Sequence, residues 1–381
     1  LIAGGGVGGL ALALALQHRS INCVVYERDA NAATRAAGYG LTMQQGGRAL
    51  DAPGVGEAAR AGRVWAMHAF SLMAPSHGPI VFSARAVPLG HNQGVRWLIT
   101  GASGFLGANA VRALQSREEV VGMVRDAGSA PWCERTVTSD LLSVQSLAGA
   151  VDEVRPDVVL HCAALADHHA CEQDPDLAHR VNADASGALA DAAAAVGSHF
   201  VYVSTDAVFD GARGWYAEDE PVSPPSAYGR SKAAGEAAVV AAHPSAVIAR
   251  TNFFGWSPSG DRSILEFFTR ELSEGRRVSG YVNYVVTSLF VEDVIDCIKR
   301  IVEAEEHGVF HVVARDGVAK ADFGRLVAAE FDLDAGLIDD VRVDGLDRDL
   351  SLRSDRLMHL TGTAMPSQAE GIVRARERGS F

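Results

Sequence analysis

Short apolar runs alternate with longer helix-like segments along the chain from residue 97 onward. The runs have the length of buried strands, whereas the segments between them have helical length and spacing. We expect strands over 97–100, 120–124, 158–161, 200–204, 247–250 and 308–313, and helices over 105–114, 142–154, 183–196, 228–242 and 320–331. This alternation predicts the α/β fold class with a doubly wound parallel sheet.

A glycine-rich turn follows the first of these strands. Gly101, Gly104 and Gly107 are spaced G-x-x-G-x-x-G, and a helix begins directly after them. Small residues at such a turn let backbone N–H groups and a helix N-terminus approach a pyrophosphate. The next strand ends in Arg125 and Asp126. An arginine there favours the 2′-phosphate of NADP(H), and a carboxylate suits the free ribose of NAD(H), so we favour NADP(H) and keep NAD(H) open.

An earlier glycine turn opens the chain. Residues 1–3 resemble the end of a strand, Gly4–Gly9 fits G-x-G-x-x-G, an apolar run follows, and a second strand over 23–26 ends at Glu27. The pattern predicts an N-terminal partial βαβ segment of the nucleotide-binding kind.

Charge is spread unevenly along the chain. Residues 1–95 hold 7 Lys+Arg against 4 Asp+Glu, and the remaining residues hold 27 against 43. We therefore place a boundary within 87–96 and expect domains at 1–92 and 93–381. The formal net charge of −13 at pH 7 argues against non-specific nucleic-acid binding, because no basic surplus neutralises phosphates.

The cysteines and the apolar runs bear on the cellular compartment. The five cysteines form no C-x-x-C pair, and their odd number does not suit a framework of paired disulfides, which indicates reduced thiols. No stretch approaches the ~20 apolar residues of a membrane span. We expect a cytoplasmic protein with no membrane partner and no metal site.

One helix carries a pair of residues suited to proton transfer. Tyr228 and Lys232 are four residues apart and share a helix face. A phenol donates a proton to a carbonyl oxygen as hydride arrives, and a nearby ammonium lowers the phenol's pKa toward the working range. The chain has only three lysines, so the retention of one here favours a functional role.

Hydroxyl groups end the strand before that helix, at the edge where open α/β sheets bind ligands. We assign to Thr205 the donation of a hydrogen bond to the substrate oxygen. Ser204 is either a cofactor-side or a structural hydroxyl, and Asp206 is either substrate-facing or a turn cap.

These residues occur within motifs that resemble the extended short-chain dehydrogenase/reductases, and most of all dTDP-4-dehydrorhamnose reductase and its relatives. The resemblance spans about 96–378 and rests on TGASGFLG, PDVVLHCAA, VYVSTDAVFDG, SAYGRSKAAGE and ARTNFFGW, in that order. It implies an NAD(P)(H)-binding Rossmann core at about 96–250 and a smaller C-terminal substrate lobe, mainly 251–381, that closes over a nucleotide-linked sugar.

The resemblance also implies roles for single residues. It makes Thr205, Tyr228 and Lys232 catalytic, with the last two also contacting the cofactor. It also implies four sets of cofactor contacts. The pyrophosphate turn is formed by Gly101, Ser103, Gly104, Phe105 and Leu106, and the adenine is contacted by Asp140 and Leu141. The backbone of Cys162, Ala163 and Ala164 lines the dinucleotide, and Asn252 and Phe253 flank the nicotinamide.

A second resemblance covers only about 1–90. The run IAGGGVGGLALALAL followed by VVYERD is similar to the N-terminus of flavin-dependent aromatic hydroxylases. The later segments that hold the flavin in those enzymes have no counterpart here, so we expect a truncated segment that binds no FAD at Gly4–Gly9.

Two departures from the family pattern narrow the function. The turn Asp167-His168-His169 is richer in histidine than in relatives, which indicates a different sugar pocket or a solvated loop pair. Ala207 stands where the related dehydratases carry a glutamate, which argues against dehydration.

We therefore expect an NADPH-dependent reductase of a keto group on a nucleotide-activated sugar. The oligomeric state stays open, with a homodimer as one option. Three alternatives stay open: a cofactor-binding regulatory subunit like the β subunit of methionine adenosyltransferase, a sugar-nucleotide epimerase, and a flavin/nicotinamide fusion oxidoreductase.

Overall fold

The computed structural model describes residues 2–3, 25–26, 94–342, 345 and 347–381. The chain divides into two units, Leu1–Asn92 and Gln93–Phe381. In the first unit the described residues are strands β1 (Ile2–Ala3) and β2 (Val25–Tyr26), which pair in parallel. The expected FAD-type turn at Gly4–Gly9 lies outside the described residues.

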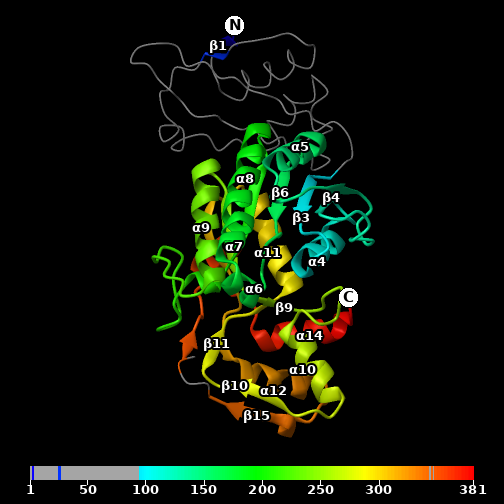
Figure 1. Cartoon of the computed structure of the whole chain (residues 1–381), viewed down its shortest axis with the longest axis vertical. Helices are drawn as coiled ribbons and strands as arrows, with labels where there is room; N and C mark the ends of the chain where they lie inside the picture. The colour runs from blue at the N-terminus through cyan, green and yellow to red at the C-terminus, as the bar shows by residue number, and fades with distance from the viewer. Residues whose placement is uncertain (1, 4–24, 27–93, 343–344, 346) are drawn as a thin grey trace. The chain divides into compact units, whose positions relative to one another are not determined.

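A seven-stranded parallel sheet forms the centre of the second unit (Figure 1). Its strands run in the spatial order β13-β8-β7-β6-β3-β4-β5. Their bounds are β3 Arg96–Thr100, β4 Glu119–Val124, β5 Thr136–Thr138, β6 Val158–His161, β7 His199–Thr205, β8 Val247–Thr251 and β13 Gly308–Val312. Because the strand order reverses between β3 and β6, the sheet has the doubly wound topology that the sequence predicts, with its switch point beside the glycine turn.

Helices cover both faces of this sheet. On one face, α5 (Val144–Val154), α8 (Ala185–Val196) and α9 (Ala227–Ala242) pack side by side over an apolar layer that includes Leu98, Val159 and Ile248. On the other face, α4 (Phe105–Leu114) packs against α11 (Val291–Glu303), over a layer that includes Ile99 and Leu160. Alternate residues of one strand thus enter opposite cores, as expected for a strand buried on both sides.

The turn between β6 and α8 was not predicted in detail. It holds the short helices α6 (His168–Gln173) and α7 (Pro175–His179) and a π-helical turn over Arg180–Asp184. Asn182 lies in this turn and is buried, and its side chain bonds to both the N–H and the carbonyl of Leu165. The π turn therefore fixes the loop that leaves the end of β6.

Small sheets and helices build a C-terminal lobe. β9 (Phe253–Phe254) pairs with β12 (Leu289–Phe290), and β10 (Val278–Tyr281) pairs with β15 (Ile338–Val341). β11 (Tyr284–Val286) lies between β14 (Val318–Ala319) and β16 (Arg348–Asp349). The helices of this part are α10 Ile264–Ser273, α12 Lys320–Glu330 and α14 Gln368–Arg378, whereas α13 Asp355–Thr361 packs against β13 and α11.

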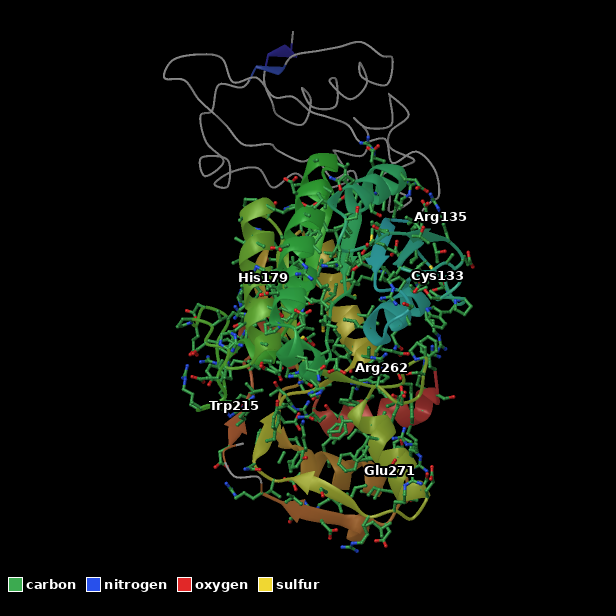
Figure 2. The ribbon with its side chains drawn as sticks, in the orientation of Figure 1. Cys133, Arg135, His179, Trp215, Arg262 and Glu271 are labelled. Atoms are coloured by element: carbon green, nitrogen blue, oxygen red, sulfur yellow. The ribbon has the colours of Figure 1, made fainter. Side chains whose placement is uncertain are left out.

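The lobe is not one continuous stretch of sequence, because α11 and β13 return to the large sheet between its parts. The loop after β7 reaches the lobe as well: Trp215, labelled in Figure 2, donates its backbone N–H to Ser351. Within the described ranges, no helix has the length and apolar character that crossing a membrane requires.

Candidate active site

The glycine turn after β3 is built for close backbone approach. Gly101 has a φ of +65°, and a Cβ on Gly107 would lie 2.2 Å from the Gly101 carbonyl oxygen. Helix α4 therefore sits directly against the turn only because Gly107 has no side chain. Gly104 is the N-cap residue of α4 and provides no side-chain cap, so the first N–H groups of the helix have no side-chain acceptor there.

The loop that leaves β6 is tied to the same turn. Thr100 Oγ1 lies 2.7 Å from His161 Nδ1 and accepts a hydrogen bond from the Ala163 N–H. A Cβ on Gly101 would meet Ala163 backbone atoms at 3.0 Å. Burial lowers the pKa of His161 to about 3, so this buried link stays neutral. The structure thus brings together Gly101 and Ala163, two of the residues predicted to line a dinucleotide.

At the end of β7 the side chains of Thr205 and Asp206 meet those of two other segments. Thr205 Oγ1 donates to Asp206 Oδ1 at 2.9 Å, and Asn252 Nδ2 donates to Asp206 Oδ2 at 2.8 Å. Ser288 Oγ in turn donates to Asn252 Oδ1 at 2.6 Å. Asp206 is buried with both carboxylate oxygens accepting, and burial raises its pKa. Asp206 therefore anchors this edge of the sheet, in addition to starting a single 3-10 turn.

Tyr228 lies next to this anchor at the start of α9. Its phenol interacts with the Thr205 side chain, while burial and then the Asp206 carboxylate raise the pKa of Tyr228 above its usual value. Ser226 caps the helix through the Gly229 N–H, which fixes the turn that presents Tyr228. The phenol is therefore protonated throughout the neutral pH range.

Lys232 lies one turn further along α9 and points into the sheet. Its ammonium donates to the Val203 carbonyl at 2.8 Å and lies 3.9 Å from the centre of the Tyr202 ring. Burial lowers the pKa of Lys232 to about 7. The ammonium is thus held by the strand carbonyl, and the expectation that it lowers the pKa of Tyr228 stays a prediction.

Ser204 has a structural partner. Its hydroxyl donates to Glu236 Oε1 at 2.6 Å, and Glu236 also receives two hydrogen bonds from Arg250, at 2.9 and 2.7 Å. All three side chains are buried. Of the two roles considered for Ser204, the structure therefore gives its hydroxyl the structural one. The Glu236–Arg250 pair itself was missed, since nothing in the sequence links a residue of α9 to one of β8.

The other residues predicted to contact a cofactor are more scattered. The Phe105 and Phe253 rings meet edge to face, with centroids 5.1 Å apart. Arg125 pairs with Asp126 at 3.2 Å, and both side chains are exposed at the end of β4. Asp140 is exposed and accepts the Leu142 N–H. Cys162 follows β6, and burial raises its pKa to about 12. Ser103 lies in the glycine turn and Leu106 in the first turn of α4, while Leu141 follows β5 and Ala164 follows β6.

The paired histidines point to different neighbours. His168 packs against the Tyr228 ring with centroids 4.5 Å apart, whereas a ring nitrogen of His169 lies 2.9 Å from Gln173 Nε2. Burial and the positive charges of Lys320 and Arg348 lower the pKa of His168. Sequence reasoning did not place Lys320, Arg348 and Tyr284 near this site. Tyr284 and Arg348 lie on strands too short to predict, and Lys320 begins a predicted helix whose packing partners the sequence does not give.

A doubly wound sheet with a glycine turn at its switch point, and with Thr205, Tyr228 and Lys232 at the end of β7, defines the class of extended short-chain dehydrogenase/reductases. More narrowly, the chain belongs to the RmlD substrate binding domain family, whose model matches residues 95–353. This confirms the resemblance stated for the second domain.

Relatives support this assignment. The chain is 33% identical over 256 residues to the probable low-salt glycan biosynthesis reductase Agl14 of Haloferax volcanii, covering 66% of this chain and 85% of that protein. It is 32% identical over 251 residues to the probable dTDP-4,6-dihydroxy-2-methyloxan-3-one 4-ketoreductase of Streptomyces antibioticus, covering 64% and 80%. The β subunit of rat methionine adenosyltransferase 2 is 37% identical over 146 residues, covering 38% and 42%.

Solved structures share the fold. The dTDP-4-dehydrorhamnose reductase of Bacillus anthracis, solved with NADP, superposes with a TM-score of 0.66 at 24% identity and covers 75% of this chain and 100% of that chain. A hypothetical dTDP-4-dehydrorhamnose reductase from Sulfolobus tokodaii gives a TM-score of 0.65 at 28% identity, covering 73% and 99%. The family model begins at residue 95, so the resemblance of residues 1–90 to flavin enzymes has no support from it.

Proposed function

We propose that the protein is an NADPH-dependent reductase that converts a keto group of a nucleotide-activated sugar to an alcohol, in the manner of dTDP-4-dehydrorhamnose reductase. Support comes from the names of two relatives that match most of their length, a reductase and a 4-ketoreductase. NADP in a structure of the same fold agrees with this cofactor.

The residues of the glycine turn fit a dinucleotide. The absent side chain of Gly107 lets α4 approach the turn, and Gly104 leaves the first N–H groups of α4 without a side-chain acceptor. A pyrophosphate suits such a helix N-terminus. Arg125, exposed at the end of β4, is the residue that would hold a 2′-phosphate. When bound, NADPH supplies the hydride.

The chain's own residues supply the proton. Tyr228, kept protonated by burial, donates its proton to the carbonyl oxygen as that oxygen becomes an alkoxide. The Thr205 hydroxyl, which donates to Asp206 in this structure, would turn its O–H to the same oxygen when substrate binds. The Lys232 ammonium, one turn away on the same helix, stabilises the phenolate until solvent returns the proton. The position of Tyr228 beside Thr205, with Lys232 one turn further along α9, is the observation that carries the proposal.

The test is NADPH oxidation by the purified chain with a panel of keto-sugar nucleotides. We expect activity with at least one 4-keto sugar and a loss of about 10²–10⁴-fold in kcat for Tyr228→Phe, which removes the proton donor. Tyr281→Phe, in β10, is the matched control and keeps full activity. A Tyr228→Phe variant as active as the parent would overturn the proposal.

A second candidate function is a cofactor-binding regulatory subunit, which the local identity to the methionine adenosyltransferase β subunit favours. The same assay separates the two. Autonomous turnover by the pure chain excludes the regulatory function, whereas cofactor binding without any turnover supports it.

A further inference from the structure

A buried carboxylate lies one turn beyond Lys232 on α9. Glu236 is 7% exposed and Lys232 is 3% exposed, and residues four apart on a helix share a face. The two Glu236 oxygens accept hydrogen bonds from Arg250 of β8, at 2.9 and 2.7 Å. The Ser204 hydroxyl, near the end of β7, donates a third at 2.6 Å. Helix α9 therefore buries an acid and a base on one face.

Three strands hold the Glu236 carboxylate in place. The Arg250 guanidinium reaches both oxygens, which is the geometry of a bidentate ion pair and fixes orientation as well as charge. Strand β13 supports the arginine, because His311 Nε2 lies 3.4 Å from Arg250 Nη1. Burial lowers the pKa of His311 to about 3, so this ring adds no charge. Contacts from β7, β8 and β13 thus set the position of the carboxylate.

The other groups that face the Lys232 ammonium are neutral. From β7 these are the Val203 carbonyl and the ring of Tyr202, whose pKa burial raises well above its usual value. From the end of β6 they are His161 and Cys162. Burial lowers the pKa of His161 to about 3 and raises that of Cys162 to about 12. In the part of the chain that the structure describes, the charge that acts on this ammonium is therefore the carboxylate one turn along α9.

The proposed reaction needs a charged ammonium at this position. Burial by itself favours the neutral amine, which would not stabilise the phenolate that Tyr228 becomes. A fixed anion one turn away opposes that loss of charge.

We propose that Glu236 is a positioning residue for the reduction, whose carboxylate keeps the Lys232 side chain charged one turn from Tyr228. Arg250 acts by orienting that carboxylate, and Ser204 ties it to β7. This rests on the proposed function for the reaction, and it gives the buried pair between α9 and β8 a part in that reaction besides its part in stability.

The charge on Lys232 can be measured without turnover. The chain has three lysines, Lys232, Lys299 and Lys320, so lysine labelled with ¹³C at the ε-carbon gives three NMR signals that follow the ionisation of each amine. The variant Lys232→Arg lacks one signal and so assigns it. Because burial lowers the pKa of Lys232 to about 7, the midpoint of its titration lies in a range where the full-length protein can be studied.

Two variants remove the carboxylate. Glu236→Gln keeps the shape of the side chain, and Glu236→Gln/Arg250→Met also removes the cation that would be left unpaired. We expect both to lower the Lys232 midpoint by about one pH unit, because a nearby opposite charge shifts a pKa by that order. Loss of the Arg250 charge would by itself raise the midpoint, so a fall in the double variant reports the missing carboxylate. In the turnover assay, the fall in kcat/KM for NADPH then begins at a pH lower by the same interval.

Ser204→Ala is the matched control. It removes one hydrogen bond of the same network but keeps the carboxylate and its cation, so the Lys232 midpoint stays as in the parent while resistance to urea falls. The Lys299 and Lys320 signals are internal references, and their titrations should not differ between the parent and the variants.

The outcomes separate this inference from the proposed activity. An unchanged midpoint in the Glu236 variants, with cooperative urea unfolding to show that they fold, would overturn the inference even if the parent reduces keto sugars. An equal shift in Ser204→Ala would also overturn it, since loosened packing would then be the cause. A lowered midpoint confined to the Glu236 variants, in a parent that reduces no sugar, would leave the action of Glu236 on Lys232 standing while the proposed activity fails.

Discussion

At the scale of single residues, the glycine turn depends on the absence of a side chain at Gly107. A methyl group on Gly107 would lie 2.2 Å from the Gly101 oxygen and 2.7 Å from its carbonyl carbon, both backbone atoms that have no freedom to rotate away. We predict that Gly107→Ala lowers the free energy of unfolding by about 1–3 kcal/mol, because α4 must shift from the turn. The same shift weakens NADPH binding at least about tenfold, as measured by cofactor fluorescence.

Gly149 provides the control for that substitution. It lies in α5, and a Cβ there would meet nothing within 4 Å. Gly149→Ala should raise stability by about 0.5–1 kcal/mol and leave cofactor affinity unchanged. Equal effects of the two substitutions on cofactor affinity would contradict the role given to the turn.

The ionisation of Lys232 sets a second prediction. Burial lowers its pKa to about 7, so in the free protein the ammonium is present below that pH and is lost as the pH rises through it. The pKa of Tyr228 is raised, so the phenol stays protonated over the same range. We predict that kcat/KM for NADPH, which reports ionisations of the free protein, falls about tenfold per pH unit above about pH 7.

Lys232→Arg separates this ionisation from others. A guanidinium keeps its charge to high pH, so the variant should be less active overall, but its kcat/KM should not fall above about pH 7. If kcat/KM of Lys232→Arg falls above pH 7 as it does in the parent, the ionisation belongs to another group.

At the scale of elements, a buried ion pair joins α9 to β8. Arg250 makes two hydrogen bonds to Glu236, and Ser204 from β7 makes a third. We predict that Arg250→Met costs about 3–5 kcal/mol in urea unfolding, because it leaves a buried carboxylate without its cation. The double variant Glu236→Gln/Arg250→Met should recover most of that loss. A single variant as stable as the double one would show that the pair does not hold the elements together.

The elements also show how far the sequence predicts the structure. Except for β5, the strands of the large sheet were predicted within one or two residues, because each is a run of buried apolar residues between helices of clear length. Strand β5 and the short strands of the lobe were not predicted, since segments of two to four residues carry no periodicity. Their pairing depends on register with distant partners.

The candidate site divides in the same way. Thr205, Tyr228 and Lys232 were predicted from their positions on one strand and one helix. The structure has Tyr228 beside Thr205 and Lys232 one turn along α9, and their catalytic roles stay a prediction. Lys320 and Arg348 were not found, because only the register of β11 with β14 and β16 brings them to Tyr284. The direction of the Lys232 ammonium, toward Val203, likewise depends on packing that spacing does not reveal.

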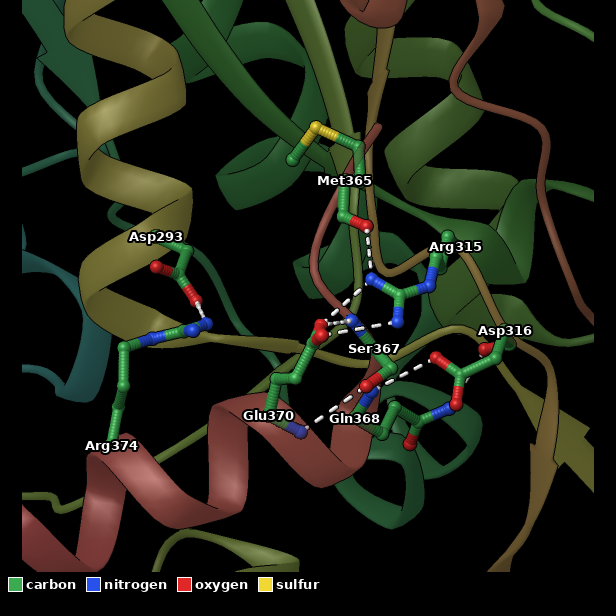
Figure 3. A network of polar contacts seen from close by, with 8 residues as sticks. All are labelled: Asp293, Arg315, Asp316, Met365, Ser367, Gln368, Glu370 and Arg374. Atoms are coloured by element: carbon green, nitrogen blue, oxygen red, sulfur yellow. Dashed lines mark hydrogen bonds and ion pairs between the residues drawn. The ribbon is translucent and has the colours of Figure 1, made fainter. Parts of the chain in front are cut away.

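At the scale of the second unit, the lobe and the large sheet share one core. The apolar cluster around Ile99 and Leu106 continues through α11 into Phe268, Phe323 and Ile372 of the lobe helices. Polar contacts reinforce this junction (Figure 3): Arg315 makes two hydrogen bonds to Glu370 of α14, and Arg374 pairs with Asp293 of α11. The lobe and the large sheet therefore form one packed body.

The central claim is that Tyr228 completes a hydride-driven carbonyl reduction, and isotope transfer tests it most directly. The purified protein is incubated with NADPH that carries deuterium at both C4 positions of the nicotinamide and with a 4-keto-sugar nucleotide, and the sugar product is analysed by mass spectrometry. The account predicts a product one mass unit heavier than that from unlabelled cofactor, with formation slowed about 10²–10⁴-fold in Tyr228→Phe. A reduced product without the label, or equal rates for the parent and Tyr228→Phe, would contradict it.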